Sequence, residues 1–360
     1  MHQPYPLTFE PILKEKVWGG TRLAGLGKDI EPGKRYGESW ELADLASTSA
    51  GGGGGGSAVS RIANGPLAGK TIQDAIRAWG GALLGKRGLI AARQFGFRGD
   101  PVFPLLIKFL DAAEHLSVQA HPSPAYAAAN PSAHLKTESW YVMEAEHSNL
   151  GDGTQVAPTV FVGTKPGTKP EVFKRRIHDG SVLGTLDAAG AVPGDCWTLP
   201  SGTLHALGAG VLVAEVQTPS DTTFRVYDWT SEYNRPKREL HIDPALESID
   251  FDGGQAAAPR RSGEGQIART EFYTIDRESP TADGLAMSDG ECVVVMGVEG
   301  NGVVRVEGAD PASGVGTLDV HRGSTVLLPA AITARTRVCA ADHAGSSGPF
   351  GVLLIRIGAG

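Results

Sequence analysis

Polar side chains stand in pairs on one face of a predicted strand near the middle of the chain. The run Leu116 to His121 alternates apolar and polar residues, which is the period-2 pattern of a strand with one buried face. Because alternate residues of a strand share a face, Gln119 and His121 leave it side by side. Pro122 ends this strand, and the Ser-Pro pair that follows is typical of a helix start.

A second strand-like run follows, and it begins with another polar pair. Lys136 and Glu138 share a face there, ahead of the apolar run Ser139 to Met143. A histidine and an amide from one strand and a carboxylate from the other could converge on a metal ion, since zinc binds such groups at about 2.0–2.2 Å. Each pair alone is more typical of a hydrogen-bonded or solvated strand face, so the metal hypothesis depends on a third group.

The segment from Gly194 to His205 supplies that third group. Its spacing is Gly, five residues, Pro, one residue, Gly, two residues, His. Cys196 to Leu199 is predicted to be a strand, and Pro200 with Gly202 predicts a tight bend that directs His205 from the next strand. This spacing resembles the second conserved motif of the cupin superfamily, which implies a β-barrel with a metal site.

Further motifs resemble the type I mannose-6-phosphate isomerases of the shorter bacterial kind. The segments that carry the resemblance are Val17–Gly20, Gly37–Glu41, Phe103–Lys108, Leu116–Pro122, Lys136–Tyr141, Pro200–His205, Glu215–Gln217, Ser220–Asp228 and Arg238–Asp243. The sequence departs from the family pattern at Ala120, at Ser123-Pro124 and at Phe224. The usual glycine-containing loop is missing between Asp228 and Arg238, which leaves substrate preference open there.

The resemblance implies a zinc site with one ion per chain. The residues that match the family's ligands are Gln119, His121, Glu138 and His205. Four protein ligands could also form a closed structural site, but glutamine is a weak ligand, which favours exchange with substrate and a catalytic metal.

The resemblance also implies roles for residues beside the metal. Lys136 matches a catalytic or substrate-orienting lysine, and Arg225 matches the arginine beside the substrate. Asp221 matches an acidic residue implicated in ring opening. We expect Lys or Arg and hydroxyl donors to bind the phosphate, with Ser117 as a candidate.

The implied reaction interconverts mannose 6-phosphate and fructose 6-phosphate by moving a proton between C1 and C2 through a cis-enediol. Zinc suits it as a Lewis acid without redox chemistry of its own. Three alternatives stay open: an iron-dependent oxidative cupin enzyme, a non-catalytic sugar-phosphate-binding protein, and a metal-dependent enzyme for another sugar phosphate.

Composition limits the class of protein. The chain has 360 residues, of which 41% are hydrophobic and 20% charged, as in ordinary globular proteins long enough for two domains. The net charge of −7 argues against a general nucleic-acid binder but allows a phosphate ligand.

Three scattered cysteines predict no disulfide framework. Without a leader or a long apolar run, we expect a soluble cytoplasmic protein with no membrane partner.

The expected fold is mainly β, with two cupin-like jelly-roll barrels and a small helical insertion near residues 66–98. We expect an N-terminal lobe and catalytic barrel over 1–245, a linker over 246–268, and a second barrel over 269–360. Gly323 to Ala334 repeats the spacing of Gly194 to His205, with alanine at the second glycine and at the histidine. This predicts a second barrel without metal ligands, although a chance match is the alternative.

Local signals predict a helix in the insertion. Over Thr71 to Leu84 apolar residues recur at helical spacing, and Thr71 with Asp74 resembles a capping box. We interpret the basic segment from Gly85 to Asp100 as an exposed linker. The unbroken glycine run from Gly51 to Gly56 is interpreted as a loop.

Overall fold

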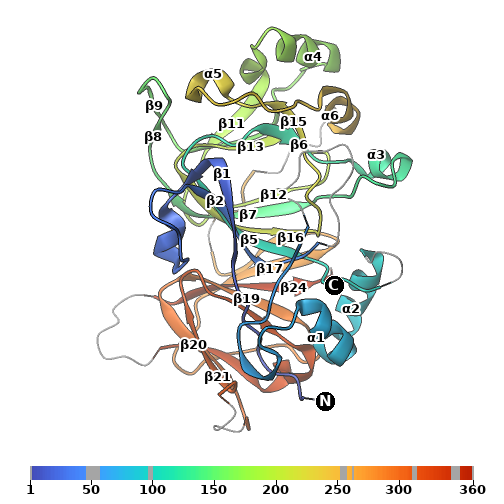
Figure 1. Ribbon diagram of the computed structural model, residues 1–360, viewed down its shortest axis with the longest axis vertical. Coiled ribbons are helices and arrows are strands. Elements are labelled where there is room, and N and C mark those ends of the chain that lie inside the picture. Colours follow the sequence, from blue (N-terminus) through green and yellow to red (C-terminus); the bar gives the residue numbers. More distant parts are fainter. Residues whose placement is uncertain are drawn as a thin grey trace.

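The structure is a computed structural model that describes residues 2–45, 57–95, 100–251, 258–261, 263–309, 314–341 and 349–358. The glycine run from Gly51 to Gly56, interpreted above as a loop, lies outside these residues. Within them the chain is mainly β, as the sequence predicted, and Figure 1 shows its sheets stacked along the long axis of the molecule.

Two antiparallel sheets form the N-terminal half. The first has the order β1 (Ile12–Gly20), β2 (Tyr36–Leu42), β5 (Leu106–Ala112), β14 (Val211–Gln217), β7 (Glu138–Ala145) and β12 (Cys196–Leu199). The second has the order β11 (Leu186–Gly190), β10 (Thr159–Thr164), β13 (His205–Leu207), β6 (Val118–Ala120) and β15 (Phe224–Tyr227). They pack face to face, since Trp140 and Val142 of β7 share one apolar cluster with Val160 and Leu207 of the second sheet.

Two more antiparallel sheets form the C-terminal half. The first has the order β16 (Gly265–Arg269), β17 (Tyr273–Glu278), β24 (Gly351–Ile357), β19 (Val293–Glu299) and β22 (Thr325–Leu328). The second has the order β18 (Leu285–Ala286), β23 (Thr336–Ala340), β20 (Asn301–Val306) and β21 (Thr317–His321). Alternate side chains of both sheets, such as Val295 and Val304, fill the core between them.

The largest apolar cluster lies between the two halves. It joins Tyr141 and Val216 of the N-terminal six-stranded sheet to Tyr273 and Ile355 of the C-terminal five-stranded sheet. Strand β14 is therefore covered on both faces and is buried along its whole length, which explains its nearly continuous apolar sequence. In Figure 1 the sheet with β5 and β7 lies directly above the sheet with β17 and β24.

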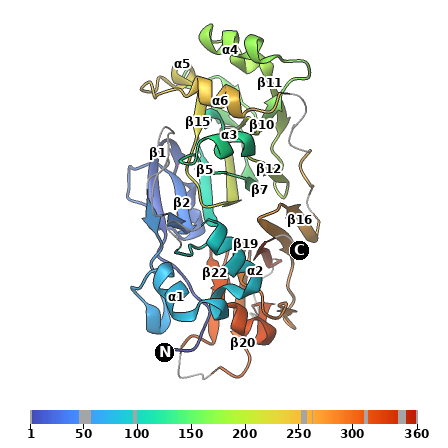
Figure 2. The same cartoon turned by 90° about the vertical axis from the view of Figure 1, so that its right-hand side faces the viewer.

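The helical insertion packs on the C-terminal half (Figure 2). Helix α1 (Ile72–Trp79) begins with the predicted capping box, in which Thr71 and Asp74 exchange hydrogen bonds. Gly80, with φ of +48°, separates α1 from α2 (Gly81–Gln94), whereas the sequence predicted a single helix over Thr71 to Leu84. The linker interpretation was wrong for residues 86–94, because α2 resumes after a kink at Gly85, which has φ of +67°, and packs against β24 and the 3-10 helix η5 (Ala330–Arg335).

The remaining short elements surround the sheets. Helices α4 (Pro170–His178) and α6 (Ile242–Ser248) pack on the five-stranded N-terminal sheet through Phe173 and Ala245. The others are α3 (Pro124–Ala129), α5 (Thr230–Tyr233), η1 (Arg22–Leu26), η2 (Gly65–Leu67), η3 (Val182–Thr185), β3 (Asp44–Leu45), β4 (Ala58–Val59), β8 (Ser148–Asn149) and β9 (Gln155–Val156).

The domain boundaries at residues 245 and 269 stay predictions, as does the linker over 246–268. The predicted repeat keeps its glycine turn, because Gly323 has φ of +95° and precedes β22. Its last part differs from the N-terminal motif, since Ala331 and Ala334 lie in η5 and not in a bend leading into a strand.

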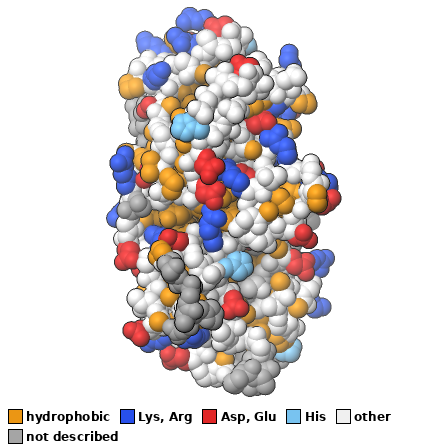
Figure 3. All heavy atoms as spheres, turned by 90° about the vertical axis from the view of Figure 1, so that its left-hand side faces the viewer, with side chains coloured by type: hydrophobic (Ala, Val, Ile, Leu, Met, Phe, Trp, Pro, Cys, Tyr) orange, Lys and Arg blue, Asp and Glu red, His pale blue; other side chains and the backbone are white. Residues whose placement is uncertain are grey.

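No helix in the described ranges is both long and apolar enough to span a membrane. On the face shown in Figure 3, acidic and basic side chains are interspersed and apolar side chains lie between them.

Candidate active site

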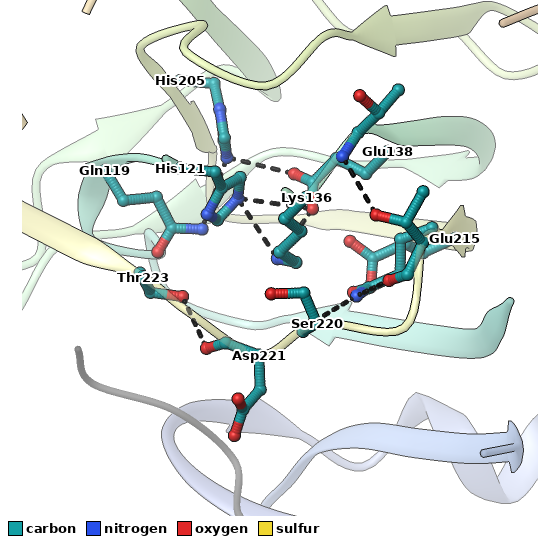
Figure 4. Close-up of polar contacts among 12 residues, drawn as sticks. Gln119, His121, Lys136, Glu138, His205, Glu215, Ser220, Asp221 and Thr223 are labelled. Atoms are coloured by element: carbon teal, nitrogen blue, oxygen red, sulfur yellow. Dashed lines mark hydrogen bonds and ion pairs between the residues drawn. The ribbon is translucent and has the colours of Figure 1, made fainter. Parts of the chain in front are cut away.

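Three side chains that the sequence singled out converge between the two N-terminal sheets. His121 follows β6, Glu138 begins β7 and His205 begins β13, and each is no more than 1% exposed. Their candidate ligand atoms all lie within 4.8 Å of one another. Nε2 of His205 is 3.0 Å from Oε1 of Glu138, and Nε2 of His121 is 3.4 Å from Oε2 (Figure 4).

The bend before His205 ties two of these segments together. Strand β12 and the following turn have the predicted conformation, with Gly202 at φ of +93°. The amide of Gly202 donates to the carbonyl of His121 at 3.1 Å, and a Cβ at this position would lie 2.8 Å from the carbonyl oxygen of Ser248. Glycine is therefore required here both by conformation and by space.

Backbone carbonyls set the orientation of both imidazole rings. Nδ1 of His121 lies 2.8 Å from the carbonyl oxygen of Thr222, and Nδ1 of His205 lies 2.9 Å from that of Thr203. A carbonyl oxygen only accepts, so each Nδ1 carries a hydrogen, and in the neutral ring Nε2 then has the lone pair. Burial, reinforced by the charge of Lys136, lowers the pKa of His121 to about 3, which keeps this ring neutral.

This donor set fits a metal cation. The Glu138 carboxylate is fully buried; its Oε2 is paired with the ammonium of Lys136 at 2.7 Å, while its Oε1 has no hydrogen-bond partner in the described part of the chain. The two oxygens also face the Nε2 atoms of His121 and His205, so three groups that can each bind a metal ion point at one another. A divalent cation can accept a lone pair from each of these groups. Metal-binding histidines typically donate a hydrogen bond from the ring nitrogen that does not bind the metal, as Nδ1 does here.

Gln119 lies at the edge of this cluster. Its register partners are His205 on one side and Arg225 on the other, so the three residues cross the sheet in a row. The amide Nε2 is 3.4 Å from Nε2 of His205, while Oε1 accepts from the Ser117 hydroxyl at 3.2 Å. Rotating the amide by half a turn exchanges these two atoms and directs the oxygen toward the metal position.

Lys136 brings a positive charge to the cluster. Its Nζ is 2.7 Å from Oε2 of Glu138 and 3.2 Å from Nε2 of His121, and the side chain is buried. The predicted Lys-x-Glu pair therefore does share a face, and its ammonium group lies beside the atoms that would bind a metal (Figure 4).

Arg225 and Asp221 lie further from the cluster. The guanidinium of Arg225 donates to the carbonyl of Glu239 at 2.8 Å, and burial together with the charge of Arg238 lowers its pKa. Figure 4 shows the Asp221 carboxylate pointing away from the His–Glu–His cluster, while the Asp221 carbonyl accepts from the Thr223 hydroxyl at 3.3 Å.

A polar cavity of about 280 Å³ opens over these residues. Its lining includes Ser117, Gln119, Lys136, Asp221 and Arg225, all of which the sequence analysis selected. His121, Glu138 and His205 do not line it, but Gln119 and Lys136, which lie beside them, do, so a small ligand in this cavity could contact these two residues and Arg225 together.

The cavity lining also includes the charged residues Lys108, Glu215 and Glu38, which the sequence analysis did not select as site residues. Nζ of Lys108 lies 3.1 Å from Glu215 and 3.7 Å from Glu38, and it donates to Gln217 at 2.7 Å. Burial raises the pKa of Glu215, whereas Lys16 and Lys108 outweigh burial at Glu38 and hold its pKa far below the usual range. The available signal was a lysine within the apolar run of β5, which cannot be buried without a partner.

Comparison with known proteins gives the same family by sequence and by fold. The model of the type I phosphomannose isomerase catalytic domain matches residues 7–157. The putative mannose-6-phosphate isomerase YvyI of Bacillus subtilis is 31% identical over 90% of this chain and 93% of its own. The probable mannose-6-phosphate isomerase GmuF of the same organism is 39% identical over 68% of each chain.

Solved structures agree with these relatives. The Bacillus subtilis mannose 6-phosphate isomerase has a TM-score of 0.71 at 27% identity and covers 98% of this chain and 99% of its own. A zinc-bound mannose 6-phosphate isomerase, at 16% identity and a TM-score of 0.69, has the same fold. The chain therefore belongs to the type I mannose-6-phosphate isomerase family, as its motifs indicated.

Proposed function

We propose that this protein is a zinc-dependent isomerase that interconverts mannose 6-phosphate and fructose 6-phosphate. The observation that carries the proposal is the convergence of two Nε2 lone pairs and a buried carboxylate beside a polar cavity. The names of the relatives, including a zinc-bound structure, supply the substrate and the metal. A cytoplasmic location belongs to the same proposal.

One zinc ion per chain would be held by His121, Glu138 and His205, with Gln119 as a fourth, exchangeable ligand. Bound there, zinc supplies Lewis-acid polarisation of the substrate's carbonyl and hydroxyl oxygens. Fixed Nδ1 hydrogens on both rings orient the ligands before the metal arrives.

We assign Lys136 and Arg225 to the oxygens on the substrate carbons between which the proton moves. Lys136 holds a proton at Nζ and donates to the oxygens on C1 and C2 while a proton moves between these carbons through a cis-enediol. Arg225 stays charged throughout, so its role is to stabilise negative charge and to position an oxygen.

The phosphate is expected at the rim of the cavity, whose lining includes Arg225, Arg238 and the hydroxyl-bearing residues Ser117 and Thr223. Asp221 also lines this rim, and we assign it to substrate binding and ring opening.

Solvent isotope exchange tests the proposal. Zinc-loaded protein incubated with mannose 6-phosphate in deuterium oxide should place deuterium on C1 of fructose 6-phosphate or C2 of mannose 6-phosphate. The variant H205A should lose both metal and exchange, whereas H147A, an exposed histidine, should retain both. Zinc-loaded wild type that binds the sugar phosphate without exchange would contradict isomerase activity, and exchange only with another sugar phosphate would correct the substrate.

A further inference from the structure

One hydroxyl from the C-terminal half reaches the back of the strands that carry the active-site carboxylates. Tyr273, the first residue of β17, is 0% exposed, and its ring belongs to the apolar cluster between the two halves. Its hydroxyl donates to the carbonyl of Val216 in β14 at 3.0 Å and lies 3.0 Å from the hydroxyl of Ser139 in β7.

Strand register places these contacts directly behind the site. Ser139 pairs with Val216, and the next pair along the two strands is Glu138 with Gln217. Alternate residues face opposite sides of a sheet, so Glu138 faces the cavity side while Ser139 faces the C-terminal half. The packing agrees, since Val216 lies in the cluster between the halves and Trp140, two residues from Glu138, lies in the inner cluster.

The hydroxyl groups form a directed chain across three strands. The Tyr273 hydrogen goes to the Val216 carbonyl, so the Ser139 hydroxyl must donate to the Tyr273 oxygen. The Ser139 oxygen can then accept from Thr198 of β12, which lies 3.3 Å away. Each hydroxyl has one hydrogen, so the direction of one bond determines the direction of the next.

The turn before β17 holds Tyr273 in place. The hydroxyl oxygen of Thr270 accepts from the amides of Phe272 and Tyr273 at 3.1 and 3.0 Å. The amide of Thr270 donates to the Tyr273 carbonyl at 2.9 Å. The tyrosine therefore presents its hydroxyl from a closed turn, with its ring packed in the interior.

We propose that Tyr273 is a positioning residue that fixes β7 against β14 and so holds the Glu138 carboxylate in place for the metal. This inference rests on the proposed function, because it assigns Tyr273 to the zinc site proposed above. It also assigns a task to the C-terminal half, which contributes no side chain to the described lining of the cavity.

The test compares Y273F with Y5F. The Tyr5 hydroxyl, also in the cluster between the halves, donates to the Asn64 carbonyl at 3.1 Å and accepts from the Leu67 amide at 2.8 Å. Both variants therefore lose one hydroxyl with two hydrogen bonds on a side chain that is at most 5% exposed, but only Tyr273 contacts the strand that carries Glu138. Zinc affinity is measured by competition with a chromogenic chelator, together with Tm, kcat and KM.

We expect Y273F to lower zinc affinity and kcat by about 10-fold each, with KM for mannose 6-phosphate unchanged. Y5F should lower Tm to a similar extent and leave zinc affinity and kcat at the wild-type values. If Y273F does not fold, S139A provides the second variant, because it removes one of the two contacts and should also weaken zinc binding.

The inference is overturned if folded Y273F, or folded S139A in its place, binds zinc with wild-type affinity. Wild type that binds zinc but does not isomerise would contradict the proposed reaction and leave the comparison of zinc affinities decisive for Tyr273. Wild type that binds no zinc would overturn both.

Discussion

Nε2 of His205 lies 3.0 Å from Oε1 of Glu138, and Nδ1 of the ring donates to the Thr203 carbonyl, so the neutral ring directs its Nε2 lone pair at a carboxylate oxygen. Two lone pairs at this separation are held together by the surrounding fold and by a nearby positive charge. In the described structure that charge is the ammonium of Lys136. The relationship makes the cluster a site prepared for a cation, and the first two predictions follow from it.

Replacing Glu138 by Gln should abolish tight metal binding. The amide keeps the shape of the side chain but removes the charge, so we expect E138Q to lower zinc affinity by at least about 100-fold, more than the loss of an outer hydrogen bond. The matched control is E144Q in the same strand, since Glu144 pairs with arginines away from the cluster. Equal zinc content in E138Q and E144Q after dialysis would contradict the ligand assignment.

Replacing Lys136 by Met should separate metal binding from turnover. The methionine fills a similar volume and removes an ammonium that lies 3.2 Å from a ligand atom. We therefore expect K136M to bind zinc at least as tightly as wild type, while kcat falls by about 100-fold or more. Zinc affinity and kcat are measured on the same preparation. Loss of zinc from K136M, or full turnover, would remove Lys136 from its assigned role.

Replacing Gly202 by Ala should damage both stability and the metal site. A Cβ at this left-handed position would lie 2.8 Å from the Ser248 carbonyl, so we expect about 1–3 kcal/mol of destabilisation and weaker zinc binding through a displaced His205. The control is G153A, because Gly153 also has a positive φ, of +86°, but a Cβ there would meet no atom of the described residues within 4 Å. Urea unfolding and zinc competition that show no greater loss in G202A than in G153A would contradict a requirement for this bend.

The folding stability should fall on acidification because of His115. This ring is buried beside Arg235, and burial lowers its pKa from 6.5 to about 4. Above pH 6.5 both states are neutral, so the group has no effect. Between pH 6.5 and pH 4 the unfolded state binds the proton better, and stability falls as pH falls, by about 2 kcal/mol at pH 5.

The variant H115F isolates this contribution. Phenylalanine keeps a ring against Trp229 but does not titrate, so the loss of unfolding free energy between pH 7 and pH 5 should be about 2 kcal/mol smaller than in wild type. Chemical denaturation at the two pH values gives this difference directly. An unchanged difference would show that His115 titrates normally in the folded protein.

Local patterns in the sequence predicted the residues of the candidate metal site. Alternation along a strand puts Gln119 beside His121 and Lys136 beside Glu138, and the glycine and proline spacing predicts the bend before His205. These signals span a few residues each, and the structure has the same local geometry. That the three segments meet depends on long-range register, which the family resemblance supplied.

What the sequence did not show depends on tertiary contacts. The helical segment over residues 86–94 follows a kink at Gly85 and contains Gly88, which disfavours a helix, and it packs against β24 and η5. The partners of Lys108 come from two other strands, and Tyr273 contacts the back of β7 and β14 from the C-terminal half. Neither contact has a local pattern, because each joins residues far apart in the chain.

The most direct test of the central claim is a zinc titration of chelator-treated protein, with turnover of mannose 6-phosphate to fructose 6-phosphate followed in a coupled assay. The account predicts no turnover without metal, and activity that rises with added zinc and stops rising at one equivalent per chain. Turnover that persists in fully metal-free protein, or zinc bound at one equivalent with no turnover, would contradict it.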